Sequence, residues 1–354
     1  MNHEIAHRRL RSQRLAGKAH RRPEEVVAWQ GAVQAQEYPA ARWGLAVRME
    51  HGATDKEIER AVDEGRILRT HVMRPTWHFV TPGDIRWMLD LTAPRVRQKM
   101  AIYARNTSLD ATTVSRSLDV FERALGDGQH LIRAELGERL TRAGISAKGV
   151  RLALLTMFAE LEGLICSGPY RAKQLTYASL AERAPNARVL PRDEALAELT
   201  LRYFRSHGPA TIRDFVWWSG LTTADAKRGL EMARATLETI NGLDYASVER
   251  RVRAGTRPLP IQLLPVYDEY LVAYRDREAV PHVWMRPSAG KPVSFQHAII
   301  AAGQVVGTWR TRPAGGGVGI EVALLRRLSA SERQRLSDAV TEYGRFLGRR
   351  VSLL

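Results

Sequence analysis

The sequence predicts a mainly α-helical protein with β-structure, built as three tandem winged-helix units followed by a C-terminal β-rich, barrel-like domain. Two observations favour this fold class. Helical patterns followed by a short hairpin pattern recur three times in the first 255 or so of the 354 residues, which is the plan of a winged helix. Beyond them, apolar runs separated by turn residues indicate antiparallel strands. The predicted units are residues 1–105, 106–190, 191–255 and 256–354.

The first unit shows this plan most clearly. Helical patterns run through HRRLRSQRLAG, PEEVVAWQGAV and AARWGLAVRME. Thr54 precedes Glu57 by three residues, a capping-box spacing that starts the helix TDKEIERAVDEG, and Gly65 ends that helix. RILRTHV and TWHFV then predict two strands joined around MRP. The unit is therefore expected to end in a β-hairpin.

The other units repeat the plan with less regular strands. The second has helical patterns in TTVSRSLDVFERALG, LIRAELGERLTRAGI and AKGVRLALLTMFAELEG, before two strands in LICSGPYRAKQLTYAS. In the third, Thr211 caps one helix of GPATIRDFVWWSGLTTADAKRGLEMA and Gly220 lies in the turn before the next. In the C-terminal domain, RPLPIQLLPVYDEYLVAY, SFQHAIIAAGQVVGTWRTR and GIEVALLRRLS are predicted strands, and SASERQRLSDAVTEYGRFLG is a closing helix.

The charge favours a polyanionic partner. The chain carries 54 basic and 38 acidic residues, a net charge of +16, which is typical of nucleic-acid-binding proteins. Its one cysteine, Cys166, excludes a disulfide framework and favours a reducing compartment. The polar N-terminus is not a secretory signal, and no apolar run reaches the length of a membrane span. We expect a cytoplasmic, nucleoid-associated monomer that binds no membrane.

Two amides stand one residue apart in GAVQAQEYPAARW, at what the pattern indicates is the end of a helix: Gln34 and Gln36. Taken alone, such a pair most often satisfies backbone groups or lies exposed. Together with ILRTHVMRPTWHFVTPGDIRWMLDLTAPRV, GPATIRDFVWWSGL and LLPVYDEYLVAYRDR, however, the chain resembles the AlkZ-like bacterial DNA glycosylases. These winged-helix proteins unhook interstrand crosslinks.

The resemblance covers nearly the whole chain. It implies three tandem winged helices and a C-terminal β-domain curved around DNA, with a catalytic pair written Gln-any-Gln or, in a sister subfamily, Gln-any-Asp. The first form falls on Gln34 and Gln36. Adjacent Glu37 is a candidate helper, by its charge or by activating water; the alternative is a solvated acid after a helix.

Amide side chains suit a restricted chemistry. Glutamine cannot act as a general base, but its carbonyl accepts a hydrogen bond from water and its NH2 donates one, so it can position a water molecule. N7-alkylated guanine is a cation that leaves the sugar as a neutral base, and weak catalysis is then enough. The sequence and the resemblance therefore predict a monofunctional DNA glycosylase for N7-alkylguanine in duplex DNA, with no cofactor.

Further basic residues are candidates for DNA contact. Period-two alternation would turn Leu68, Val72, Trp77 and Phe79 toward the core, with Arg69, His71 and His78 together on the other face, either near the site or as a solvated polar surface. Arg74 at the hairpin tip could contact a phosphate or the minor groove. Lys227 and Arg228 on a later helix could contact phosphates or be solvated. Two histidines seven residues apart without Cys or acidic partners predict no metal site.

Asp268 and Glu269 are adjacent in VYDEYL. In a strand they would point to opposite faces, so no more than a supporting role is predicted for them.

Two other functions remain open at this point. One is a non-enzymatic DNA-binding protein or transcriptional regulator, although three different winged helices fit a palindromic site poorly. The other is a protein that sequesters a DNA-alkylating natural product.

Overall fold

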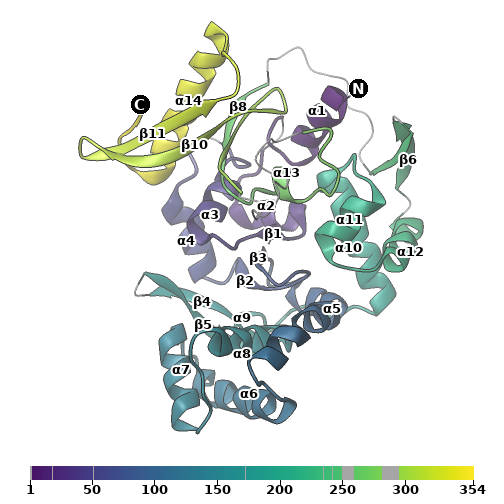
Figure 1. Ribbon diagram of the computed structural model, residues 1–354, viewed down its shortest axis with the longest axis vertical. Coiled ribbons are helices and arrows are strands. Elements are labelled where there is room, and N and C mark those ends of the chain that lie inside the picture. Colours follow the sequence, from purple (N-terminus) through teal and green to yellow (C-terminus); the bar gives the residue numbers. More distant parts are fainter. Residues whose placement is uncertain are drawn as a thin grey trace.

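The computed structural model describes residues 2–17, 19–50, 52–171, 173–233, 235–240, 242–248, 259–280 and 295–354. Over these residues the chain is a mixed α/β protein with fourteen helices, three small sheets and a larger, curled C-terminal sheet (Figure 1). None of the helices in these ranges is long and apolar enough to cross a membrane.

The first predicted unit contains the segment with the two glutamines. Its elements are α1 (Asn2–Ser12), α2 (Pro23–Gln30), β1 (Val33–Gln34), α3 (Tyr38–Ala46), α4 (Asp55–Asp63), β2 (Leu68–His71) and β3 (Trp77–Val80). The hairpin β2–β3 is confirmed, and β1 adds to it in the order β1-β3-β2. The cap is also confirmed, because the Glu57 N–H donates to Thr54 Oγ1 at 3.2 Å.

The prediction that the glutamines end a helix is wrong. Gly31 has a φ of +83°, a left-handed conformation that glycine adopts without strain, and α2 stops before it at Gln30. The chain then becomes extended and pairs with β3, with Val33 opposite Phe79 and Gln34 opposite His78. The Gln-Ala-Gln segment therefore starts on a strand.

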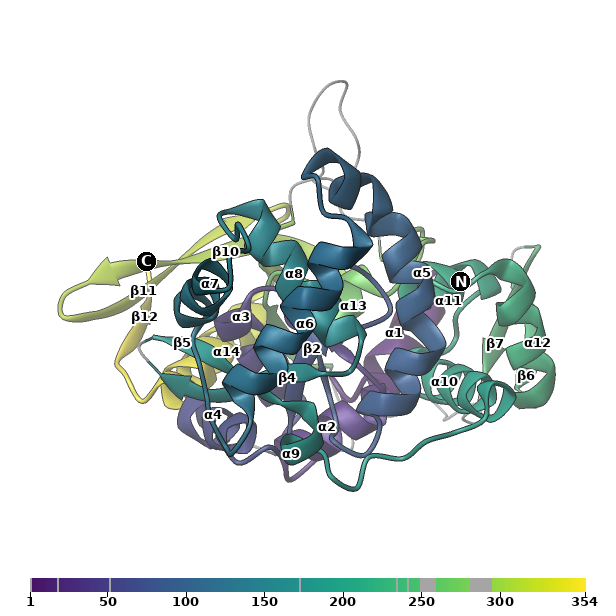
Figure 2. The ribbon, with the colours of Figure 1, turned by 90° about the horizontal axis from the view of Figure 1, so that it is seen from below.

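The predicted first unit ends with α5 (Ile85–Asn106). The second segment contains α6 (Ala111–Leu125), α7 (Arg133–Arg142), α8 (Val150–Leu161), β4 (Ile165–Arg171), β5 (Gln174–Ser179) and α9 (Leu180–Arg183). The long helix α5 packs against both α8 and α10, and Figure 2 shows it between the second and third segments. The third segment contains α10 (Arg192–His207), α11 (Ile212–Ser219), α12 (Thr223–Ala233), β6 (Thr236–Ile240) and β7 (Leu243–Ser247). Thr211 caps α11 as predicted.

The C-terminal region contains β8 (Ile261–Leu264), α13 (Glu269–Val272), β9 (Ala298–Ala301), β10 (Gln304–Ala314), β11 (Gly317–Leu324), the closing helix α14 (Ala330–Leu347) and β12 (Val351–Leu353). Its sheet runs in the order β12-β11-β10-β9-β8. A register shift between Val305 and Gly307 bends β10, as β-bulges do. The described strands curl as an open half-barrel, which meets the barrel-like prediction in part.

The strand predicted through Asp268 and Glu269 is a helix start. β8 ends at Leu264. The next residue, Pro265, has no N–H to donate to a neighbouring strand. Asp268 then caps α13 by accepting a hydrogen bond from the Tyr270 N–H at 2.9 Å. The prediction is wrong because a proline and a local cap outweigh the apolar run.

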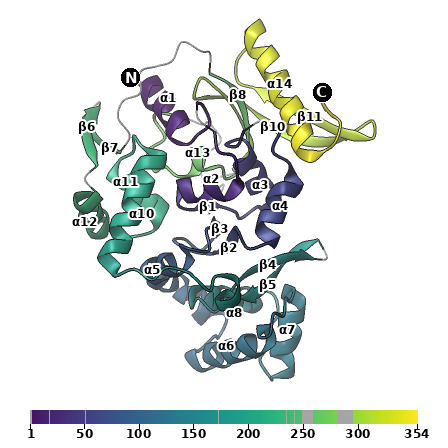
Figure 3. The ribbon, with the colours of Figure 1, turned by 180° about the vertical axis from the view of Figure 1, so that it is seen from behind.

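The small sheet β1-β3-β2 lies at the centre of the molecule, between the C-terminal region and the second segment (Figures 1 and 3). Leu68 and Val80 belong to an apolar core shared with α5, α8 and α10. Val33 and Phe79 belong to a second core shared with the C-terminal sheet and α14. Packing on both faces therefore fixes the strand that carries Gln34.

Candidate active site

Both glutamine side chains rest against the hairpin. Gln34 is buried, and its Oε1 accepts a hydrogen bond from Arg74 Nη2 at 3.0 Å. Gln36 is half-buried, and its Oε1 lies 3.4 Å from the Trp77 N–H. Between them, the Ala35 N–H donates to the Trp77 carbonyl at 2.7 Å. The pair is therefore held by β1, which contains Gln34, and by the hairpin β2–β3.

The hairpin register separates residues that were predicted to share a face. Thr70 and Gln34 both pair with His78, whereas His71 pairs with Trp77 and Arg69 with Phe79. Directly paired residues in a sheet point to the same face, and neighbours along a strand point to opposite faces. The prediction of one face for Arg69, His71 and His78 is wrong, since His78 lies on the Gln34 side.

Leu68, Val72 and Phe79 are core residues as predicted, but Trp77 is half-buried.

On the Gln34 side, Arg74 turns inward rather than outward from the hairpin tip. Its Nη2 also lies 3.3 Å from His78 Nε2. His78 Nδ1 is 2.9 Å from the Thr76 carbonyl, so Nδ1 carries the proton and Nε2 is free to accept from Arg74. Burial, with the charge of Arg74, lowers the pKa of His78 to about 3. His78 is therefore neutral, and Arg74 is the cation beside Gln34.

On the opposite side, Arg69 and His71 support the backbone. Arg69 donates to the carbonyls of Ala35 at 2.9 Å and Gln36 at 3.3 Å, and its guanidinium lies 4.3 Å from the Trp77 ring centroid. His71 hydrogen-bonds Glu160 on α8, which also accepts from Trp77 Nε1. His71 is buried, whereas Arg69 is half-buried, and both side chains are engaged within the protein.

Glu269, for which the sequence predicts no more than a supporting role, contacts Gln34 directly, a contact that the sequence reasoning did not predict. Its Oε1 accepts from the Gln34 N–H at 2.7 Å, and its Oε2 accepts from Trp218 Nε1 at 2.9 Å. His207 Nε2 lies 3.5 Å from the same Oε2. Burial alone would raise the pKa of Glu269, but His207, Arg74 and the Gln34 N–H lower it to about 2. The sequence signal was an acid inside the apolar run VYDEYLVAY.

The geometry can now be compared with known proteins. A family model described as "DNA glycosylase AlkZ-like" matches residues 27–346. The chain belongs to the AlkZ-like DNA glycosylase family. This membership confirms the resemblance seen in the sequence and makes the chain a DNA glycosylase.

A curated protein and a solved structure, both AlkZ of Streptomyces sahachiroi, are similar to this chain over most of its length. The curated protein named interstrand DNA cross-link repair glycosylase is 24% identical over 322 residues, which is 85% of each chain. The solved structure of the DNA glycosylase AlkZ has a TM-score of 0.81 at 20% identity, and the match covers 99% of this chain and 98% of that one. The AlkZ-like fold therefore accounts for the arrangement of the described residues from the first segment to the C-terminal sheet.

The remaining predicted residues of this AlkZ-like protein do not meet at the glutamine pair. Lys227 and Arg228 lie on α12 at the outer edge of the molecule, whereas β1 is central (Figure 1). Both are exposed, and Arg228 forms an ion pair with Asp193 at 2.5 Å. Among the residues that the structure describes, no cluster of three or more His, Cys, Asp or Glu side chains could hold a metal ion.

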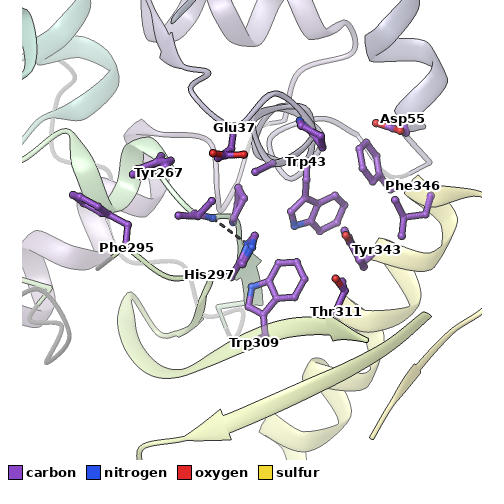
Figure 4. Close-up of a pocket in the computed structure, with 15 residues that line it drawn as sticks. Glu37, Trp43, Asp55, Tyr267, Phe295, His297, Trp309, Thr311, Tyr343 and Phe346 are labelled. Carbon is purple, nitrogen blue, oxygen red and sulfur yellow. Dashed lines mark hydrogen bonds between the residues drawn. The ribbon is translucent and has the colours of Figure 1, made fainter. Parts of the chain in front are cut away.

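Glu37, the candidate helper, opens onto a cavity of about 510 Å³ rather than onto the hairpin (Figure 4). Aromatic side chains, including Trp43, Trp309 and Tyr343, line this cavity. His297 also lines it and accepts a hydrogen bond from the Val266 N–H at 3.1 Å through Nδ1. Burial lowers the pKa of His297. The cavity therefore lies between α3 and the C-terminal sheet, and Glu37, the residue after Gln36, is part of its lining.

The charge of Glu269 predicts a loss of stability in acid. Its pKa in the folded protein, about 2, is below the ordinary 4.5, so the charged form stabilises the fold. This contribution, on the order of 3 kcal/mol, is complete above pH 4.5 and is lost as the pH falls toward 2. We expect Glu269→Gln to be less stable than wild type at pH 7, with a smaller difference at pH 3. Urea unfolding at the two pH values measures this, and a difference that does not change with pH would contradict it.

Proposed function

We propose that this protein hydrolyses the N-glycosidic bond of N7-alkylated guanine in duplex DNA and unhooks interstrand crosslinks that contain it. The observation that carries the proposal is the position of the Gln34 side chain. Arg74 fixes it through Oε1, and the small sheet that contains Gln34 is packed on both faces. The printed name of the curated relative, an interstrand cross-link repair glycosylase, supports the same substrate class.

The chemistry follows from what an amide can and cannot do. The transition state of N-glycosidic hydrolysis has oxocarbenium character, and carboxylates normally stabilise it. Gln34 and Gln36 supply no charge, so the leaving group must supply the activation. With Oε1 held by Arg74, Gln34 keeps its NH2 and the second lone pair of Oε1 for the attacking water. Gln36, two residues along the chain, is proposed to hold the same water or the sugar.

The wider arrangement is proposed to serve duplex DNA. We propose three winged-helix units over residues 1–105, 106–190 and 191–255 and the β-rich domain over 256–354, acting as a monomer in the cytoplasm. Exposed Lys227 is a candidate phosphate contact on α12. Arg69, His71 and His78 are proposed to hold the hairpin, since each is engaged within the protein.

The substrate is tested with two duplexes that share one sequence. One carries a single N7-methylguanine, and the other carries one interstrand crosslink between two guanine N7 atoms. We expect abasic sites from the first and separated strands on a denaturing gel from the second. Release from the first alone would remove crosslinks from the proposal. Release from neither, together with protection of one defined promoter sequence, would favour a DNA-binding regulator.

Arg74→Met separates positioning from DNA contact. Methionine keeps the apolar stem of the side chain but removes the donor to Gln34. We expect base release to fall by about tenfold or more, while DNA affinity changes by less than about threefold. A phosphate contact would behave differently, because its loss weakens binding to all sequences and lowers the salt dependence by about one ion. Binding titrations at three salt concentrations, beside single-turnover rates, distinguish the two roles.

A further inference from the structure

We propose that Glu269, at the start of α13, is a positioning residue for the glutamine pair. Its carboxylate holds the backbone of Gln34 in place and is itself held by side chains of the third segment. The role rests on the proposed function, because it concerns the groups that carry the reaction there. Glu269 is 235 positions from Gln34 in the sequence, yet their hydrogen bond is 2.7 Å long.

The need for such a contact follows from the sheet. β1 is an edge strand, paired only with β3. The Ala35 N–H points inward to the Trp77 carbonyl, so the Gln34 N–H points to the outer edge, where a further strand would normally accept it. A buried N–H without an acceptor is costly. The carboxylate of Glu269 takes the place of the missing strand.

The carboxylate is itself fixed from several directions. Trp218 on α11 donates to its second oxygen, and His207 at the end of α10 lies beside that oxygen. Trp218, His207 and Glu269 are all nearly inaccessible to solvent. Through Glu269, the position of the Gln34 N–H at the edge of β1 therefore depends on how α10 and α11 are packed.

A carboxylate suits this position better than its amide. Two N–H donors approach two different oxygens, and only an ionised carboxyl group offers acceptors on both. A glutamine at this position would turn an NH2 group toward either Gln34 or Trp218. From the other face, Arg69 holds the carbonyls of Ala35 and Gln36. The backbone that carries the pair is thus held at its N–H and C=O groups by side chains of opposite charge.

Position matters here because the amides contribute no charge. Displacement of a catalytic group by about 1 Å can cost about 100-fold in rate. We therefore expect Glu269→Gln to lower the single-turnover rate of base release at saturating enzyme by about 100-fold. The Kd for the substrate duplex should change less than about twofold, since the Glu269 side chain is nearly inaccessible to solvent.

Asp84→Asn is the matched control. Asp84 is also a buried carboxylate, and hydrogen bonds from Arg202, Thr81 and Arg188 oppose its burial and lower its pKa to about 2. It binds side chains of α5, α10 and the intervening segment and does not contact β1. The two variants should lose comparable thermal stability, but Asp84→Asn should keep a wild-type rate. Similar rate losses in both variants would overturn the proposal, because only general destabilisation would then be at work.

Trp218→Phe provides a rescue. Without the indole N–H, a glutamine at 269 can turn its oxygen to Gln34 and its NH2 toward the phenylalanine ring. The Glu269→Gln, Trp218→Phe double variant should recover about tenfold in rate over Glu269→Gln. No recovery, with the fold intact by circular dichroism, would count against the geometry of the two acceptors.

Hydrogen exchange of the Gln34 amide separates the inference from the proposed function. We expect faster exchange at Gln34 in Glu269→Gln than in wild type or Asp84→Asn. If wild type releases no base, the proposed function fails, while exchange still decides whether Glu269 fixes this strand. Equal exchange at Gln34 in all three proteins would overturn the inference, whatever the rates.

Discussion

Replacing Gln34 and Gln36 together by alanine is expected to abolish base release while leaving the fold and the DNA affinity nearly intact. Alanine tolerates the extended backbone, and each amide makes one polar contact with the hairpin. The attacking water then loses both of its proposed holders, so the rate should fall by at least about 100-fold. Single-turnover release from an N7-methylguanine duplex, beside a binding titration, measures both quantities.

A conservative control sharpens this result. Gln30 is a buried glutamine at the end of α2, close in sequence but outside the pair. We expect Gln30→Ala to change stability and leave the rate per folded molecule unchanged. Base release by the double alanine variant at the wild-type rate would remove the pair from the mechanism, and the amides would then be ordinary polar groups on the hairpin.

Replacing Asp268 by alanine is expected to cause the largest loss of stability. Both Asp268 oxygens accept hydrogen bonds from Arg48 at 2.8 Å, and both side chains are nearly fully buried. Removing one partner leaves a buried charge unpaired, at a cost of about 3–5 kcal/mol. The cap of α13 is lost as well, which adds about 1 kcal/mol. The unfolding free energy from urea titration measures the effect.

The partner variant tests the same ion pair from the other side. Arg48 also donates to the Gln13 and Gly44 carbonyls, so Arg48→Met should be costly too, and the double variant should lose less than the sum of the two. A loss below about 1 kcal/mol for Asp268→Ala would contradict this account.

Local patterns predicted the parts of the fold that local chemistry decides. Thr54 and Thr211 cap the helices that follow them, because a cap needs only residues within one turn. The β2–β3 hairpin and the closing helix α14 also follow from short patterns. The failures arose where a distant partner or a turn decided the outcome.

The register of the hairpin is one such case. Alternation along a single strand is visible in the sequence, but the connection over residues 72–76 sets which residues of β3 face those of β2. His78 was therefore assigned to the wrong face. Gly31 likewise ended α2 before the glutamines, although glycine in a helical pattern is an ambiguous signal.

The candidate site depended least on local pattern. Gln34 and Gln36 were selected by resemblance to a family, since spacing alone favours an ordinary polar role. Nothing near Glu269 in the sequence indicates that it reaches β1, because the contact depends on how α10, α11 and α13 pack together. Arg74 was expected to face DNA and instead turns toward Gln34, a choice that side-chain packing makes and the pattern cannot show.

The central claim is that a pair of neutral amides cleaves a base whose own positive charge supplies the activation. It is tested most directly by comparing release of N7-methylguanine, a cation, with release of 7-methyl-7-deazaguanine, its neutral analogue of the same shape, from one duplex. We predict release of the cationic base and none of the neutral one. Comparable release of both bases would contradict the account, because the protein would then have to supply an acid or a base that the glutamine pair lacks.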